Sequence, residues 1–131
     1  MTRTRSDGGM VTAFVVTLTM ALLFAAGLAY DAGRLVDARI AAADTAAGAA
    51  RAGAQHTVVD AAGHLVLDER AAREAAAEFI TDPAYRVHVE VSAGAVTVTV
   101  TRTLGLTFLR LFGLGHKDVR AVHTAQPLEG S

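Results

Sequence analysis

An uncharged segment runs from Met10 to Tyr30 and reads MVTAFVVTLTMALLFAAGLAY. An α-helix of about twenty residues rises about 30 Å, which is the thickness of the hydrocarbon core of a bilayer. The strongly apolar side chains of this segment together favour insertion by roughly 3–5 kcal/mol. Its threonines oppose insertion only weakly, because a helical threonine hydroxyl can bond to its own backbone. The segment therefore predicts a membrane-spanning helix.

Two other interpretations of this segment stay open. A buried core helix would need more protein around it than a chain of 131 residues provides. A cleaved secretory signal would have an apolar stretch of roughly 7–15 residues ahead of a cleavage site. Ala25-Ala26-Gly27 has the composition of such a site, but the apolar stretch is longer and the helical pattern continues through it. We therefore favour the spanning helix.

The charges that flank the segment predict its orientation. Arg3 and Arg5 precede the span, whereas acidic and basic residues alternate over residues 31–39. Because cytoplasmic flanks carry an excess of arginine and lysine, we expect the N-terminus in the cytoplasm. The rest of the chain would then lie outside the cell membrane, as the extracytoplasmic part of a single-pass protein.

The helix is expected to continue beyond the lipid. Residues 31–55 read DAGRLVDARIAAADTAAGAARAGAQ, and alanine is the best helix former. We predict one helix from about Val11 to Ala54, with Gly48 and Gly53 as its weakest points. Small residues recur four apart at three positions, which lets two helix backbones approach closely in a membrane. An alanine-rich helix also produces this pattern by chance. These candidate helix–helix packing residues are Ala25, Ala29 and Gly33.

The remainder of the chain predicts a small α+β domain with an antiparallel sheet and one or two packing helices. Alternating valines over residues 87–91 and 96–100 give a hairpin with one apolar face. Asp68 is a candidate N-cap, and the helix after it would cover that face with residues 72–79. The other expected elements are a small hairpin or irregular excursion over 57–67, a short apolar helix or turn over 104–113, a loop at 115–118 and a last strand over 119–127. The chain thus divides into a leader-like cytoplasmic segment (1–9), a transmembrane helix (10–30), its extracytoplasmic continuation (31–55) and an extracytoplasmic α+β domain (56–131).

The sequence lacks the signatures of catalysis and of metal binding. It has no cysteine, which excludes disulfides and thiolate sites, and its five histidines show no metal-ligand spacing. The formal net charge of −1 lacks the basic footprint of a nucleic-acid binder. We therefore expect no enzyme activity, no cofactor, no nucleic-acid partner and no small-molecule substrate. The expected partners are membrane lipid and other membrane helices.

Several segments, taken in order, resemble a known family. They are DGGMVTAF (7–14), GLAYDAG (27–33), ADTAAGAARAGA (43–54), and VTVTVTRT (96–103) followed by an apolar helix and a final strand. In this order they resemble the TadE/TadG-like proteins of the Tad (Flp-type) pilus assembly system, in the version found in high-GC Gram-positive bacteria. The order of the segments is more specific than any single one, since alanine-rich helices are common.

The resemblance implies a function and a processing site. Such proteins look like minor pilins or pseudopilins, which are single-span membrane subunits with an extracytoplasmic domain and a structural role among other pilin-like subunits. Proteins of the pilin class are cut by a prepilin peptidase after a glycine before the span, which would fall between Gly9 and Met10 here. The glutamate that is frequent in that class would fall on Phe14. The alternative function is a single-pass membrane anchor or accessory protein that recruits a secretion or cell-envelope partner.

Overall fold

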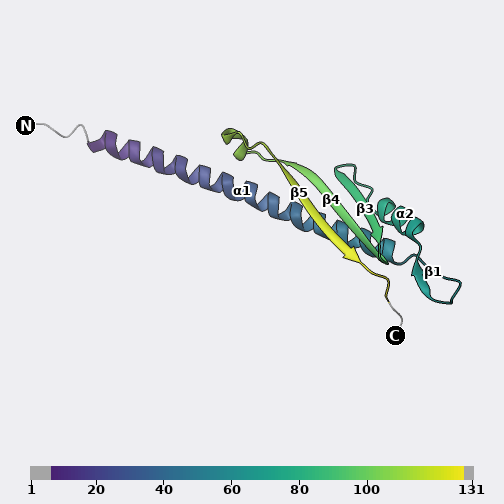
Figure 1. The fold of residues 1–131 in the computed structure, drawn as a ribbon. Coiled ribbons are helices and arrows are strands. Elements are labelled where there is room, and N and C mark those ends of the chain that lie inside the picture. Colours follow the sequence, from purple (N-terminus) through teal and green to yellow (C-terminus); the bar gives the residue numbers. More distant parts are fainter. Residues whose placement is uncertain (1–6, 129–131) are drawn as a thin grey trace, which may run out of the picture.

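The computed structural model describes residues 7–128, which form one long helix and a small head built against its second half (Figure 1). The head is residues 55–128. The α+β class expected from the sequence is confirmed. The elements are, in order, α1 (Asp7–Ala54), β1 (Thr57–Val59), β2 (Leu65–Leu67), α2 (Glu69–Phe79), β3 (Tyr85–Ser92), β4 (Ala95–Gly105), the short 3-10 helix η1 (Leu109–Phe112) and β5 (His116–Ala125).

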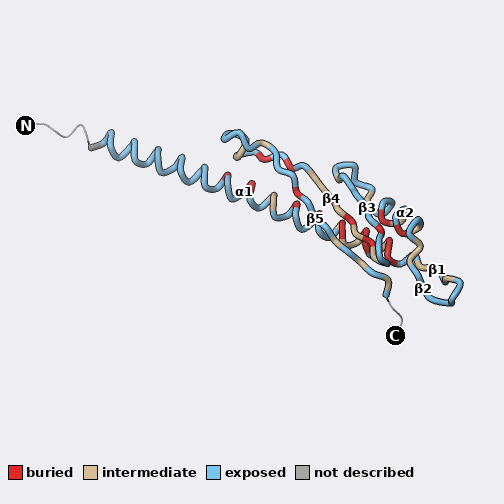
Figure 2. Tube along the Cα trace, in the orientation of Figure 1, coloured by how far each residue is buried: buried red, intermediate tan, exposed pale blue. Residues whose placement is uncertain are grey.

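Helix α1 is uninterrupted, but its two halves have different surroundings (Figure 2). Every residue from Gly8 to Ala26 is exposed. From Gly27 onward, buried residues recur at spacings of three and four, so one face of the helix enters the core of the head. The continuous helix predicted from about Val11 to Ala54 is confirmed and begins a turn earlier. Its buried positions are Gly27, Asp31, Ala38, Ala42, Ala46, Ala49, Ala50, Gly53 and Ala54.

The sheet has three antiparallel strands in the order β3-β4-β5. The turn between β3 and β4 has only two central residues, Ala93 and Gly94, and both have positive φ, at 51° and 74°. Positive φ at both positions gives a turn whose twist matches that of the flanking strands. The predicted hairpin and its register, with Val91 opposite Val96, are therefore produced by local turn chemistry together with alternation.

The valine face of the sheet packs mainly on α1. Val96, Val98 and Val100 of β4 are fully buried and join the alanines of α1 in one core. The prediction that residues 72–79 cover this face is correct only for β3, because α2 packs on β3 while α1 covers β4 and β5. The alanine row of α1 therefore does more than favour a helix, because it is also a flat packing surface for valine side chains.

Two glycines of α1 are points of close approach rather than weak points. A Cβ on Gly53 would lie 2.7 Å from the carbonyl oxygen of Ala72 and 3.0 Å from Cγ1 of Val96. A Cβ on Gly48 would lie 2.6 Å from Cζ of Phe79. At Gly53 the neighbour is backbone, so α2 lies too near α1 for a side chain there, whereas at Gly48 the neighbour is the outer end of an exposed ring.

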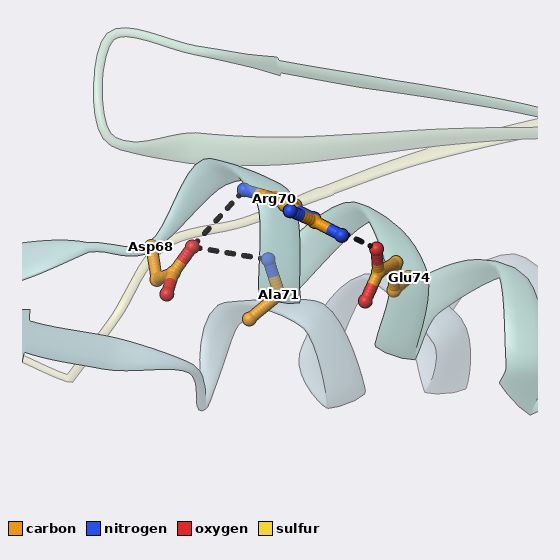
Figure 3. Close-up of polar contacts among 4 residues, drawn as sticks. All are labelled: Asp68, Arg70, Ala71 and Glu74. Carbon is orange, nitrogen blue, oxygen red and sulfur yellow. Dashed lines mark hydrogen bonds and ion pairs between the residues drawn. The ribbon is translucent and has the colours of Figure 1, made fainter.

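The start of α2 follows the predicted cap. The carboxylate of Asp68 accepts hydrogen bonds from the backbone N–H groups of Arg70 (3.1 Å) and Ala71 (3.0 Å), as Figure 3 shows. One turn later the Arg70 side chain donates to Glu74 at 3.1 Å. These contacts fix where α2 begins and place its buried residues, Ala72 and Ala76, against the core.

The segment between β4 and β5 differs from its predicted boundaries. β4 extends to Gly105, so the helical part of residues 104–113 is only η1. β5 begins at His116, so most of the predicted loop at 115–118 is strand. Cross-strand pairing explains both changes, because the pairing of β4 with β5 continues to Gly105 and His116 and leaves only a short apolar connection between the two strands.

Candidate membrane-contact and assembly surface

The first half of α1 presents an apolar surface on all sides. Phe14 is 67% exposed, Leu22 62% and Leu23 64%, although such side chains are usually buried. Helix α1 is long and apolar enough to cross a membrane, and only 6% of its most apolar 18-residue stretch is buried. This exposure excludes the alternative of a core helix within the part of the chain that the structure describes.

The polar groups within this half are paired inside the helix. The hydroxyls of Thr12, Thr17 and Thr19 each donate to the carbonyl four residues earlier, at 2.8–2.9 Å. The expected back-bonding is confirmed. The helix therefore presents little unpaired polarity to an apolar environment.

Asp31 joins α1 to the connection between β4 and β5. Its side chain is 1% exposed and accepts three backbone hydrogen bonds. Oδ1 accepts from the N–H of Thr107 at 3.0 Å, and Oδ2 accepts from Phe108 at 2.7 Å and Leu109 at 2.9 Å. Burial alone would raise the pKa of this carboxyl, but the three N–H groups and nearby Arg34 lower the pKa below its ordinary value.

The same connection makes apolar contacts one and two turns earlier on α1. The ring of Phe108 lies directly on Gly27, where any Cβ would overlap it. The rings of Phe24 and Phe112 meet edge to face with centroids 6.3 Å apart. On the other side of Asp31, the guanidinium of Arg34 donates to the carbonyl oxygen of Gly105 at 3.0 Å. The connection is thus fixed to α1 at four successive levels.

The sequence alone does not indicate this junction. In the sequence Asp31 is one of the alternating charges that follow the span, and its hydrogen-bond partners lie 76–78 residues further along the chain. Glycine at position 27 and an acid one turn later give no pattern that points to such a contact.

The predicted packing residues lie on the other side of the helix. Ala25 and Ala29 each lie two residues from Gly27, which is about 200° around the helix. Both are exposed, as is Gly33, and a Cβ on Gly33 would meet nothing within 4 Å. The head therefore leaves this face of α1 uncovered.

The predicted processing site lies in the first turns of α1. Gly9 and Met10 are exposed, and a Cβ on Gly9 would meet nothing within 4 Å. Arg3 and Arg5, on which the predicted orientation depends, lie outside the described residues. Across residues 7–128 there is no group of three metal-ligating side chains.

Comparison with known proteins gives one match. The family described as "Putative Flp pilus-assembly TadE/G-like" matches residues 8–56, which are α1 from its second residue and the two residues after it. No curated protein and no solved structure matches the chain. Over these residues the match confirms the resemblance seen in the sequence. Residues 8–56 of this chain are therefore similar to the TadE/G-like proteins of Flp pilus assembly, and the head lies almost wholly outside the matched part.

Proposed function

We propose that the chain is a membrane-anchored, minor-pilin-like subunit of Flp-type pilus assembly, with a structural role rather than a catalytic one. In this proposal residues 1–9 lie in the cytoplasm, residues 10–30 span the membrane once, and residues 31–131 belong to the extracytoplasmic side. Its partners are lipid and other pilin-like subunits. The proposal needs no cofactor, metal or small-molecule substrate.

The observation that carries the proposal is the division of α1. One uninterrupted helix is exposed from Gly8 to Ala26 and uncharged from Met10 to Tyr30, whereas its second half contributes alanines to the core of the head. A pilin-like subunit needs an apolar helix that rests in lipid and can pass into a bundle of helices without exposing polar groups. The paired threonine hydroxyls support that requirement.

The uncovered face of α1 supports contact with a neighbouring helix. Ala25, Ala29 and Gly33 are small, lie four residues apart and point away from the connection that covers Gly27. Close approach of backbones at small residues is a common mode of helix association in membranes. We propose that a neighbouring subunit packs on this face.

Membrane extraction tests the anchor. Alkaline carbonate should leave the full chain in the membrane pellet, and detergent should release it. Intact mass of the extracted protein then tests processing. Loss of residues 1–9 supports a prepilin-type cut, whereas loss of residues 1–27 would identify a secretory signal and refute the spanning helix.

Single-cysteine cross-linking tests the assembly face, because the native chain has no cysteine. Ala29→Cys should form cross-linked species in native membranes. Leu28→Cys is the matched control, since it lies at the same depth but about 100° around the helix. Equal cross-linking at both positions, or none at Ala29→Cys in a membrane-bound protein, would favour a plain anchor that recruits another partner.

A further inference from the structure

The connection between β4 and β5 ends in an exposed apolar tip. Leu111 is 71% exposed, Phe112 66% and Leu114 59%, although all three belong to a segment that is firmly attached to α1. We call these three residues the apolar tip. Within the described residues nothing covers them, and most of their area faces outward.

The attachment fixes the tip beside the predicted span. Phe112 meets Phe24, and Phe108 lies on Gly27, so the connection reaches back over the last two turns of the uncharged segment. Figure 1 shows this connection lying alongside α1, away from the rest of the sheet. The head therefore cannot lie wholly outside a membrane that contains residues 10–30.

The depth of the tip follows from the geometry of the helix. If Tyr30 marks the outer boundary of the hydrocarbon, Phe24 lies about 9 Å inside it, at about 1.5 Å per residue. If the hydrocarbon begins at Gly8 and is about 30 Å thick, it ends near Gly27, and Phe24 is about 5 Å inside. In both cases the partner of Phe112 lies among acyl chains.

The tip is continuous with other lipid-facing surface. Phe24 and Leu28 on the adjoining turns of α1 are 45% and 42% exposed, so tip and helix form one apolar patch. The charges around it match an anionic membrane surface. Residues 104–117 contain no acidic residue but carry Arg110 and Lys117, both exposed. Basic side chains of this kind reach phosphate groups while adjacent apolar residues enter the lipid.

We propose that the apolar tip inserts into the outer leaflet beside α1 and anchors the head at the membrane surface through a second point of lipid contact. The Asp31 carboxylate is the positioning group, because it holds residues 107–109 at a fixed level on the helix. This inference rests on the proposed membrane anchor. A protein partner on the tip is the competing outcome.

Tryptophan fluorescence tests the proposal in the full chain, which contains no native tryptophan. Three single variants are reconstituted in vesicles of phosphatidylcholine and phosphatidylglycerol: Leu111→Trp in the tip, Leu18→Trp in the span and Leu65→Trp in the β1–β2 hairpin. Leu65 is a matched control, because it is 67% exposed but lies at the opposite end of the head. Emission is compared with and without phosphatidylcholine brominated near the carboxyl end or near the methyl end of its chains.

We expect bromine near the carboxyl end to reduce the emission of Leu111→Trp about twofold, as for side chains buried 5–10 Å below the headgroups. The emission of Leu18→Trp should be quenched more by bromine near the methyl end than by bromine near the carboxyl end. The emission of Leu65→Trp should be quenched by neither brominated lipid. Quenching of Leu18→Trp without quenching of Leu111→Trp would overturn the tip insertion and leave the anchor standing. Blue-shifted but unquenched Leu111→Trp would show a protein partner instead and overturn the proposal, as would equal quenching of Leu65→Trp. An unquenched Leu18→Trp would refute the anchor itself.

Discussion

Replacing Gly53 by alanine should destabilise the head, although the same change at Gly33 of the same helix should not. Alanine is favoured over glycine in a helix interior by about 0.8–1.0 kcal/mol. At Gly53 the new methyl group would lie 2.7 Å from the carbonyl oxygen of Ala72 and 3.0 Å from Val96. The first neighbour is backbone, so α1 and α2 must separate. Overpacking of this kind costs about 1–3 kcal/mol, leaving a net loss of up to about 2 kcal/mol.

Gly33→Ala is the matched control. It lies in the same helix, and its Cβ would meet nothing within 4 Å. Its effect should be neutral or stabilising by up to about 1 kcal/mol, according to how much of α1 unfolds with the head. The free energies of unfolding of the two variants should therefore differ by about 1–3 kcal/mol, with Gly53→Ala the less stable.

Hydrogen exchange of the full chain in detergent micelles measures this difference. The amides of Val96 and Val98 report the opening of the buried central strand, and each 1.4 kcal/mol corresponds to about a tenfold change in their exchange rate. Exchange should be faster in Gly53→Ala and unchanged or slower in Gly33→Ala. Equal rates in the two variants would refute the close crossing of α1 and α2.

Three further predictions concern the core and the two aspartates. Val98→Ala removes two buried methyl groups and should lower the free energy of unfolding by about 2–3 kcal/mol, measured by urea denaturation in micelles. Asp31→Asn should speed exchange of the amides of residues 107–109 at least several-fold, whereas Asp37→Asn, at an exposed position of the same helix, should leave them unchanged. Backbone hydrogen bonds, above all that from His64, hold the pKa of Asp60 below its ordinary value of 3.8. A carboxylate with a lowered pKa stabilises the fold at pH values above its pKa in the unfolded chain. This stability is lost as the pH falls through its pKa in the folded chain. Protection of the β1–β2 turn, measured by NMR against unstructured reference rates, should therefore fall below about pH 4 and stay constant between pH 5 and 7; a loss centred above pH 5 would contradict this assignment.

Much of the backbone could be predicted because its signals are local. The absence of charge over residues 10–30 and the alanine content after them specify α1 without any tertiary information. Alternating valines and a two-residue turn specify the β3–β4 hairpin, and Asp68 specifies the start of α2.

The features that were missed depend on contacts between distant residues. Strand pairing extended β4 and β5 into residues assigned to a helix and a loop, because Gly105 and His116 have no strand signal of their own. The sequence does not show that α1 covers most of the valine face, since an alanine row does not indicate which strands it contacts. Nothing in the sequence around Asp31 and Gly27 indicates a contact with Phe108, which lies 77 residues beyond Asp31.

The unbroken course of α1 has a mechanical consequence. From Asp31 to Ala54 the helix extends about 35 Å without interruption, so α1 offers no break at which the head could turn independently. If the segment of residues 10–30 tilted by about 10°, the Ala54 end of the helix would therefore move sideways by about 6 Å over that length. A force applied at the Ala54 end of α1 would likewise be transmitted directly to residues 10–30.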